Sequence, residues 1–286
     1  MTALATPPPF SFSALLRLTV DEFIDRPGHY CALALIYAAP GLMLQLFTPV
    51  GALQMTAAAG GEVSPQEFGT WISVAVLVSL VVTAAMIGSF TYSVVSSLRG
   101  APISLVAALG HGIGSITHGV ALGLALAAGL ALLTVPAAAL PLALGASADA
   151  ANSLVLILVL TLVFALMIRF FVAWNVAVAE SAWPLQAIRR SIFLTDGSRM
   201  TILGVFVALV IGTLLASLVI GGLVALLMTP VIRGGSPEEG LRTIQAVGAV
   251  ASAPVSAFSL MIPATAYFLL SVEKDRRNLQ DAQVFE

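Results

Sequence analysis

The chain has 286 residues, of which 59% are hydrophobic and only 9% are charged, and its net charge is −2. A soluble globular chain has about 25% charged residues, so this composition leaves too little polar surface for a domain in water. It indicates a membrane protein instead. The single cysteine, Cys31, excludes an internal disulfide, and no cysteine and histidine spacing typical of a metal site is present.

Six apolar runs are long enough to cross a bilayer as helices. They cover residues 29–48, 72–96, 119–144, 153–175, 201–228 and 245–271. The links at 49–70, 145–152 and 229–243 are rich in Gly, Pro, Ala and acidic residues, as expected of turns outside a bilayer. We therefore predict an all-α integral membrane protein with six transmembrane helices. The first 28 residues lack an apolar region followed by a cleavage site, so we expect no signal peptide.

Basic residues are concentrated on one side of this six-span arrangement. That side carries Arg17, Arg26, Arg99, Arg189, Arg190, Arg199, Lys274, Arg276 and Arg277. Only Arg233 and Arg242 lie on the other side, and Arg169 lies within the fourth span. Because cytoplasmic loops carry an excess of basic residues, both termini are predicted to be cytoplasmic, in a bacterial inner membrane.

Amphipathic segments at 12–25, 104–118 and 184–196 precede the first, third and fifth spans. Each has apolar residues on one helical face, and we expect helices that lie in the cytoplasmic membrane interface. In the first segment the predicted apolar face consists of Phe12, Leu15, Leu16, Val20 and Phe23.

These segments divide the chain into three tandem units, each an interfacial helix followed by a two-span hairpin. The units are 11–98, 99–180 and 181–277, and a short cytoplasmic tail follows at 278–286. A local match supports the repeat, since "RGAPISL" leaves the second span as "ESAWPLQ" leaves the fourth. Any six-span protein shows some hairpin periodicity, so a chain without true repeats is the alternative.

Arg169 is the one charge well inside an apolar run. An ionisable group within a span is by default a candidate functional residue. However, the fourth span runs toward the cytoplasm and Arg169 lies near that end, where a long side chain can extend to the headgroups. We favour this anchoring role over a functional one.

Two further patterns have both a structural and a functional interpretation. His111 and His118 share a helical face, but a third ligand is missing nearby, so solvated or headgroup-facing histidines are favoured over a metal site. Small residues recur at four-residue spacing, which lets helices approach closely. They are Gly119, Gly123 and Ala127 in the third span and Gly204, Ala208, Gly212 and Ala216 in the fifth. Packing within the chain is favoured over an oligomer interface.

Catalytic motifs are lacking. The sequence contains no HExxH, GxSxG, P-loop or dinucleotide-binding motif, and the spans contain no paired carboxylates. The loops are also too short to fold a catalytic domain. We expect a protein that is not an enzyme and that needs no cofactor or metal.

The stretch "AESAWPLQAIRRSIFLTDGSRMTILGVFVALV" resembles the membrane domain fused to bacterial glycerophosphodiester phosphodiesterases and the related YciC-like membrane proteins. The family pattern falls here on Glu180, Ala187, Ile188, Arg190, Ser191, Leu194 and Gly197. The opening "FSFSALLRLTVDEFIDRPGHY" is also similar. The chain departs from the pattern at Ile188 and at Thr195-Asp196, where a basic residue often precedes the glycine. The resemblance implies a multi-span membrane domain without the hydrolase domain, so the hydrolase activity is not carried over.

Two functions remain open at this point, with an enzyme acting on lipids as a distant third. The first is an accessory or scaffold subunit that binds lipids, another membrane complex or a second copy, and no nucleic acid. The second is a transporter or lipid-handling permease for a neutral or lipid-like substrate. Residues expected to contact headgroups or a partner are Arg99, Arg169, Trp183, Arg189, Arg190, Arg199, Arg276 and Arg277. Glu180 is expected to pair with an arginine and to stabilise the bundle.

Overall fold

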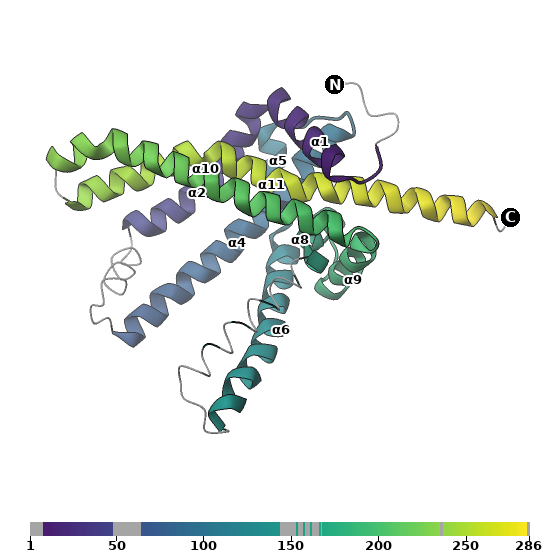
Figure 1. Cartoon of the computed structure of the whole chain (residues 1–286), viewed down its shortest axis with the longest axis horizontal. Helices are drawn as coiled ribbons and strands as arrows, with labels where there is room; N and C mark the ends of the chain where they lie inside the picture. Colours follow the sequence, from purple (N-terminus) through teal and green to yellow (C-terminus); the bar gives the residue numbers. More distant parts are fainter. Residues whose placement is uncertain are drawn as a thin grey trace.

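The computed structural model describes residues 8–47, 64–143, 153, 157, 161, 166, 168–234 and 237–284. Every regular element in these residues is a helix, as the predicted all-α class requires (Figure 1). The helices are α1 (Phe12–Asp25), α2 (Pro27–Phe47), α4 (Pro65–Leu98), α5 (Leu105–Gly114), α6 (Ile116–Ala143), α8 (Ala173–Ala179), α9 (Pro184–Thr195), α10 (Arg199–Gly234) and α11 (Pro237–Val284).

Among the described residues, three to four helical segments are long and apolar enough to cross a membrane. They are Gly69–Leu98, Arg199–Leu227 and Ala246–Arg276, together with a pair, Leu105–Gly114 and Ile116–Leu132, that is bent by 50°. These segments overlap the second, fifth, sixth and third predicted spans. The first predicted span falls within α2 except for its last residue, and about half of the fourth, 153–175, lies outside the described residues.

Several helices extend beyond the apolar runs. α4 begins at Pro65 rather than near residue 72, and the predicted link at 229–243 is helical except at 235–236, which are not described. α11 continues to Val284, so most of the predicted tail is helical. Apolar composition marks only the stretch suited to a bilayer, whereas backbone hydrogen bonding carries a helix on into polar residues.

Local sequence fixes where the short helices begin. Ser11 and Ser104 cap α1 and α5, because their hydroxyl oxygens accept the backbone N–H of Ala14 at 3.2 Å and of Ala107 at 3.3 Å. α9 has Pro184 in its first turn, where a missing N–H costs nothing.

The three short helices bury the same pattern of residues. Relative to a first position i, the buried positions are i, i+4 and i+7, which form one face of a helix. They are Leu15, Thr19 and Glu22 on α1, Ala108, Gly112 and Ser115 on and just after α5, and Ala187, Ser191 and Leu194 on α9. In each case the first of these positions donates its backbone N–H to the carbonyl of the N-cap residue.

This pattern corrects the predicted apolar face of α1. Leu15 is fully buried as expected, but Phe12 and Val20 are exposed at 39% and 38%. The buried face is rotated toward Thr19 and Glu22, because α1 packs against a helix rather than only against an apolar medium. α5, which was also predicted to lie in the membrane interface, packs on α4 and is bent by 50° from α6.

Contacts between helices run round the whole assembly. α5 packs on α4, α9 packs on α8, and α1 packs on α11, so the first of the described helices contacts the last of them. The backbone N–H of Phe10 adds a hydrogen bond of 2.9 Å to the Glu273 carboxylate. α4, α8 and α11 also contact one another, while α2 contacts both α11 and α4.

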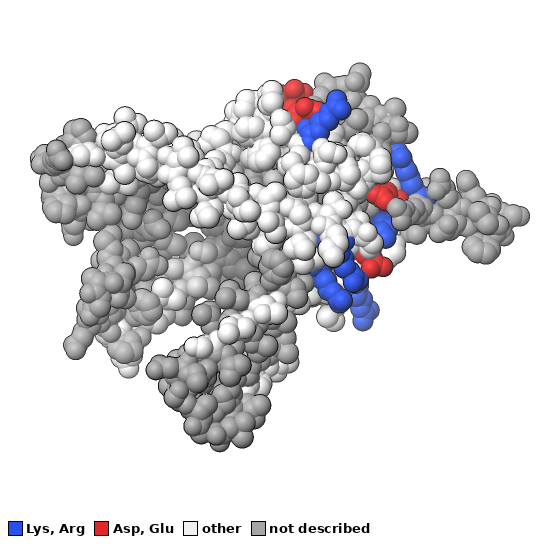
Figure 2. Space-filling model, in the orientation of Figure 1, with Lys and Arg blue, Asp and Glu red and all other residues white. Residues whose placement is uncertain are grey.

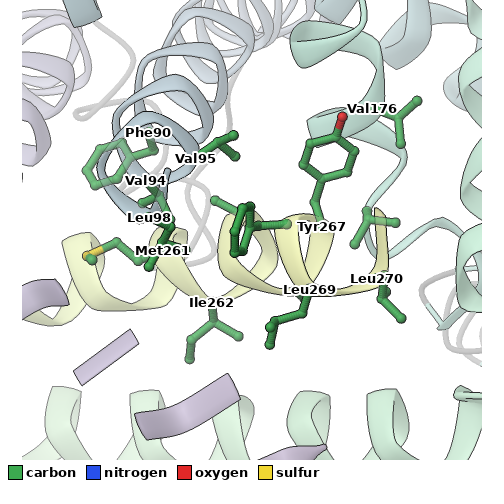
Figure 3. Packing of buried hydrophobic residues seen from close by; sticks show 14 of the residues in the cluster. Phe90, Val94, Val95, Leu98, Val176, Met261, Ile262, Tyr267, Leu269 and Leu270 are labelled. Carbon is green, nitrogen blue, oxygen red and sulfur yellow. The ribbon is translucent and has the colours of Figure 1, made fainter. Parts of the chain in front are cut away.

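The buried core lies where α4, α8 and α11 meet. Figure 3 shows Phe90, Val94 and Leu98 of α4 beside Met261 of α11, and Tyr267 pointing toward α8. Away from this core α4, α6 and the hairpin of α10 and α11 diverge (Figure 1). In the view of Figure 2 the described charged side chains lie on the side of α1, α9 and the C-terminal part of α11. This packed side forms the charged end of the described part of the molecule.

The small residues of α6 allow close helix packing, as predicted, and a glycine of α5 does the same without having been predicted to. A Cβ atom at Gly112 would overlap Ser89 Oγ and the Ala85 carbonyl, and one at Gly119 would lie 2.6 Å from Ala84 Cβ. A Cβ at Gly123 would overlap Leu80 and approach the Trp174 ring to 3.0 Å. Only glycine permits these separations.

The corresponding prediction for α10 is wrong at its glycines. A Cβ atom at Gly204 or Gly212 would meet nothing within 4 Å. Ala208, Gly212 and Ala216 line an apolar groove beside α1 and α11 instead. The spacing is the same as in α6, but none of the described residues comes close to the two glycines of α10.

Candidate functional site: a polar network around Glu180

Glu180 lies at the end of α8 and joins three helices through its carboxylate. Its Oε1 accepts the hydroxyl of Tyr267 on α11 at 3.0 Å and the Nε of Arg190 on α9 at 3.4 Å. The Nη2 of Arg190 in turn contacts Oδ1 of Asp275 on α11 at 3.1 Å. The predicted pairing of Glu180 with an arginine is therefore confirmed.

This Glu180 network is partly shielded from solvent. The side chains of Arg190 and Glu180 are 28% and 34% exposed, whereas Asp275 is 59% exposed. Partial burial lowers the pKa of Arg190, but the hydrogen bond to Asp275 and the negative charge of Glu180 outweigh it, so the pKa is raised. Arg190 consequently stays charged at any physiological pH, and the network does not act as a pH switch through this residue.

A second set of contacts ties the end of α9 to α11. Lys274 Nζ donates to the Asp196 carbonyl at 3.0 Å, and Arg199 Nη2 lies 2.9 Å from Asp196 Oδ1. Phe193 lies beneath two cations, with Arg190 at 5.6 Å and Lys274 at 5.3 Å from its ring centre. Phe193 thus holds two cations on the otherwise polar face of α9, a role that the sequence pattern does not predict.

The other family-motif positions pack α9 against α8. Ala187, Ser191 and Leu194 are fully buried, and Ile188 is half-buried. Gly197 has a φ of +82°, which residues other than glycine rarely adopt, and it forms the turn into α10. These positions therefore serve packing and chain direction.

Arg169 lies beside α9 rather than far from it. Its backbone carbonyl accepts the Ser191 hydroxyl at 2.9 Å, and its side chain is exposed. This position is compatible with the anchoring role, because α9 carries the polar network at the charged end.

The remaining predicted contact residues do not converge on one point. Arg99, Arg189 and Arg276 are exposed, and the structure gives them no ion pair within the described ranges. Trp183 is 59% exposed and its ring lies 5.7 Å from that of His118. The Arg277 side chain lies outside the described residues.

The histidines do not form a shared site. His111 stacks on Tyr92 at 4.0 Å, and His118 contacts Trp183. Among the residues that the structure describes, no three side chains of His, Cys, Asp or Glu are grouped to hold a metal ion. The described residues thus offer no assembled metal centre.

A buried carboxylate on α1 was missed by the sequence analysis. Glu22 is fully buried, and its Oε1 accepts the hydroxyl of Tyr30 at 2.6 Å. Its Oε2 has no hydrogen-bond partner in the described part of the chain. The nearby Arg26 donates to the Ile103 carbonyl at 2.8 Å. The i, i+4 and i+7 spacing from Leu15 is the sequence signal that places Glu22 on the buried face.

A second buried polar contact links α8 to α4. Asn175 Nδ2 donates to Thr91 Oγ1 at 2.8 Å, and both side chains are buried. Such a hydrogen bond fixes the relative position of two apolar helices. The polar groups of this end therefore hold helices together.

An apolar pocket of about 400 Å³ lies next to this packed end. Its wall combines residues of α6, the segment 166–174, α10 and α11. Its lining includes Leu126, Ala127, Leu166, Phe170, Trp174 and Phe206. A volume of this size is typical of a small-molecule site, and an apolar lining favours an apolar ligand.

Comparison with protein-family models, curated proteins and solved structures gave no match. The resemblance to the YciC-like membrane proteins therefore stays a prediction that rests on the motif around Glu180.

Proposed function

We propose that the chain is a non-enzymatic inner-membrane protein that serves as an accessory or scaffold subunit for lipids or another membrane complex. In this proposal six helices cross the bilayer as three tandem units, both termini are cytoplasmic, and the family is that of the YciC-like membrane domains. The matching buried faces of α1, α5 and α9 support the tandem units. The excess of basic residues near one set of helix ends supports the orientation.

The exposure of α10 is the observation that carries the proposal. Its apolar segment Arg199–Leu227 has only 11% of its most apolar window buried, against 61% for Ala246–Arg276. Large side chains such as Leu214, Leu215 and Leu218 are each more than half exposed. In a bilayer such a helix faces lipid or a helix of another protein, and small residues on it favour close approach.

The Glu180 network supports a structural role for the charged end. Glu180, Arg190 and Asp275 satisfy one another and bridge α8, α9 and α11. The carboxylate of Glu180 is engaged by an arginine and a tyrosine from two other helices. The network is suited to holding the helices at fixed positions for a partner.

The apolar pocket favours a second candidate function, lipid handling. A transporter for a neutral or lipid-like substrate needs a cavity between its helices, and about 400 Å³ lies between α6 and α10. The described residues place no cluster of charges in its wall, which favours an apolar substrate over an ion.

Purification from the native membrane in a mild detergent tests the proposal. We expect a membrane protein to be retained reproducibly, and to be lost when Leu214 and Leu218 are replaced by alanine while thermal stability is kept. The matched control replaces the buried Leu269 by alanine, which is expected to lower stability instead. A chain that runs alone in several mild detergents contradicts the accessory function and leaves lipid handling as the better candidate.

A further inference from the structure

The apolar pocket has a defined wall that includes several aromatic side chains. Trp174 lies in the first turn of α8, and its ring packs against α6 at Gly119 and Gly123. Phe170 and Phe206 lie on other parts of the wall. Glycine at position 123 leaves room for the indole, so the pocket depends on the same close packing that joins α6 to α4.

The pocket lies between two diverging helices. α6 and α10 leave the packed end in different directions (Figure 1), and the pocket separates Leu126 and Leu130 of α6 from Phe206 and Leu209 of α10. Leu124 and Val210 on the same helices are exposed apolar residues. If these helices cross a bilayer, hydrocarbon chains surround the space between them.

A basic residue lies beside the pocket at the charged end. Arg169 follows the wall residue Leu166 by three positions and directly precedes Phe170. Residues three apart on a helix are neighbours on its surface, so the side chain of Arg169 begins next to the pocket wall. It is exposed, and the described residues give it no ion pair.

The pocket is large enough for part of a hydrocarbon chain, because its volume of about 400 Å³ falls within the range of small-molecule sites. Its lining is almost entirely apolar, which suits a flexible acyl chain, and the attached headgroup would lie toward Arg169.

We propose that the pocket binds one acyl chain of an anionic phospholipid from the surrounding leaflet, with the lipid phosphate on Arg169. This inference rests on the membrane placement proposed above and gives the lipid-binding role a specific site. The apolar wall supplies affinity for the chain, because burial of hydrocarbon is favourable. The guanidinium supplies a preference for the negative headgroup through charge-assisted hydrogen bonds.

Tryptophan fluorescence offers a direct test, because Trp174 lines the site. The chain has three tryptophans, and replacing Trp71 and Trp183 by phenylalanine leaves Trp174 as the only reporter. The full chain is purified in a mild detergent and titrated with phosphatidylglycerol whose acyl chains carry bromine, which quenches indole fluorescence on contact. We expect saturable quenching at about one lipid per chain.

Matched variants separate the pocket from general lipid contact. Ala127→Phe fills the pocket and is expected to weaken binding at least tenfold, whereas Ala128→Phe, on an adjacent exposed position outside the lining, is expected to leave it unchanged. Arg169→Gln is expected to remove the preference for phosphatidylglycerol over brominated phosphatidylcholine, and Arg189→Gln is expected to keep it. Circular dichroism of each variant checks that the helices are retained.

Three results would overturn the inference. Quenching that never saturates, or that is equal in Ala127→Phe and Ala128→Phe, shows contact with bulk lipid only. Saturable quenching without a headgroup preference rejects the assignment of the phosphate to Arg169. Loss of binding when the chain dimerises shows that a second copy covers the site. None of these results depends on retention of a partner protein, so the accessory function succeeds or fails separately.

Discussion

α6 and α10 carry similar stripes of small residues but use them differently. In α6, Gly119 and Gly123 receive side chains of α4 and Trp174 at distances that a larger residue could not tolerate. In α10, Gly204 and Gly212 face open space. Four-residue spacing of small residues therefore shows that a helix can be approached closely. The position of the helix in the assembly decides whether another helix of the same chain does so.

The largest expected effect comes from adding a side chain at the close packing of α5 on α4. Gly112→Val places new atoms against Ser89 and the Ala85 backbone, and overpacking of this kind costs about 3 kcal/mol. The same substitution at Gly212 on α10 meets no neighbour and should change stability by about 0.5 kcal/mol or less. Thermal unfolding in detergent measures both. Equal losses would remove the contrast between the two helices.

The next effect concerns the buried carboxylate on α1. Tyr30→Phe removes the hydroxyl that Glu22 accepts, and an unsatisfied buried group costs about 2 kcal/mol. Tyr92→Phe at a position 37% exposed is the control and should cost little. The free energy of unfolding in mixed micelles gives the comparison. If the two variants lose the same free energy of unfolding, the buried hydrogen bond between Tyr30 and Glu22 does not stabilise the fold as the structure indicates.

A smaller loss is expected at the Glu180 network. Glu180→Ala leaves Arg190 with only Asp275 and removes the partner of Tyr267, at a cost of about 1 kcal/mol for a site one-third exposed. Glu180→Gln keeps an oxygen for Tyr267 and should lose less. Melting temperature in detergent measures the difference, and unchanged stability of Glu180→Ala would refute a structural role for this carboxylate.

The smallest effect on folding is expected on the outer surface of α10. Leu218→Ala removes a side chain that is 64% exposed, so stability should change by about 0.5 kcal/mol or less. Its effect should instead appear in the amount of partner retained during native purification. A loss of stability as large as that of Gly112→Val would mean that this face is buried within the chain.

Patterns with a local cause could be read from the sequence. The all-α class, the main apolar spans, the close packing at Gly119 and Gly123, and the pairing of Glu180 with an arginine all follow from spacing within one or two adjacent helices. Helix ends were less predictable, because α10 and α11 continue into polar residues that their apolar spans do not mark.

Contacts between distant segments could not be read in this way. Tyr267 and Asp275 join the Glu180 network from α11, far along the chain, and nothing local marks them. Glu22 was missed because a charged residue next to Asp21 is expected on the polar face. Its side chain is instead buried, and its carboxylate accepts the hydroxyl of Tyr30 on α2.

The contact between α1 and α11 has a consequence for biogenesis. α1 is synthesised before α11, the helix on which it mainly packs, and the backbone N–H of Phe10 is held by Glu273 of that helix. Until α11 has been inserted, α1 lacks its main packing surface. A ribosome that stalls before α11 therefore leaves an amphipathic segment exposed, which chaperones and membrane proteases can bind. Docking of α1 thus depends on a segment that is made much later.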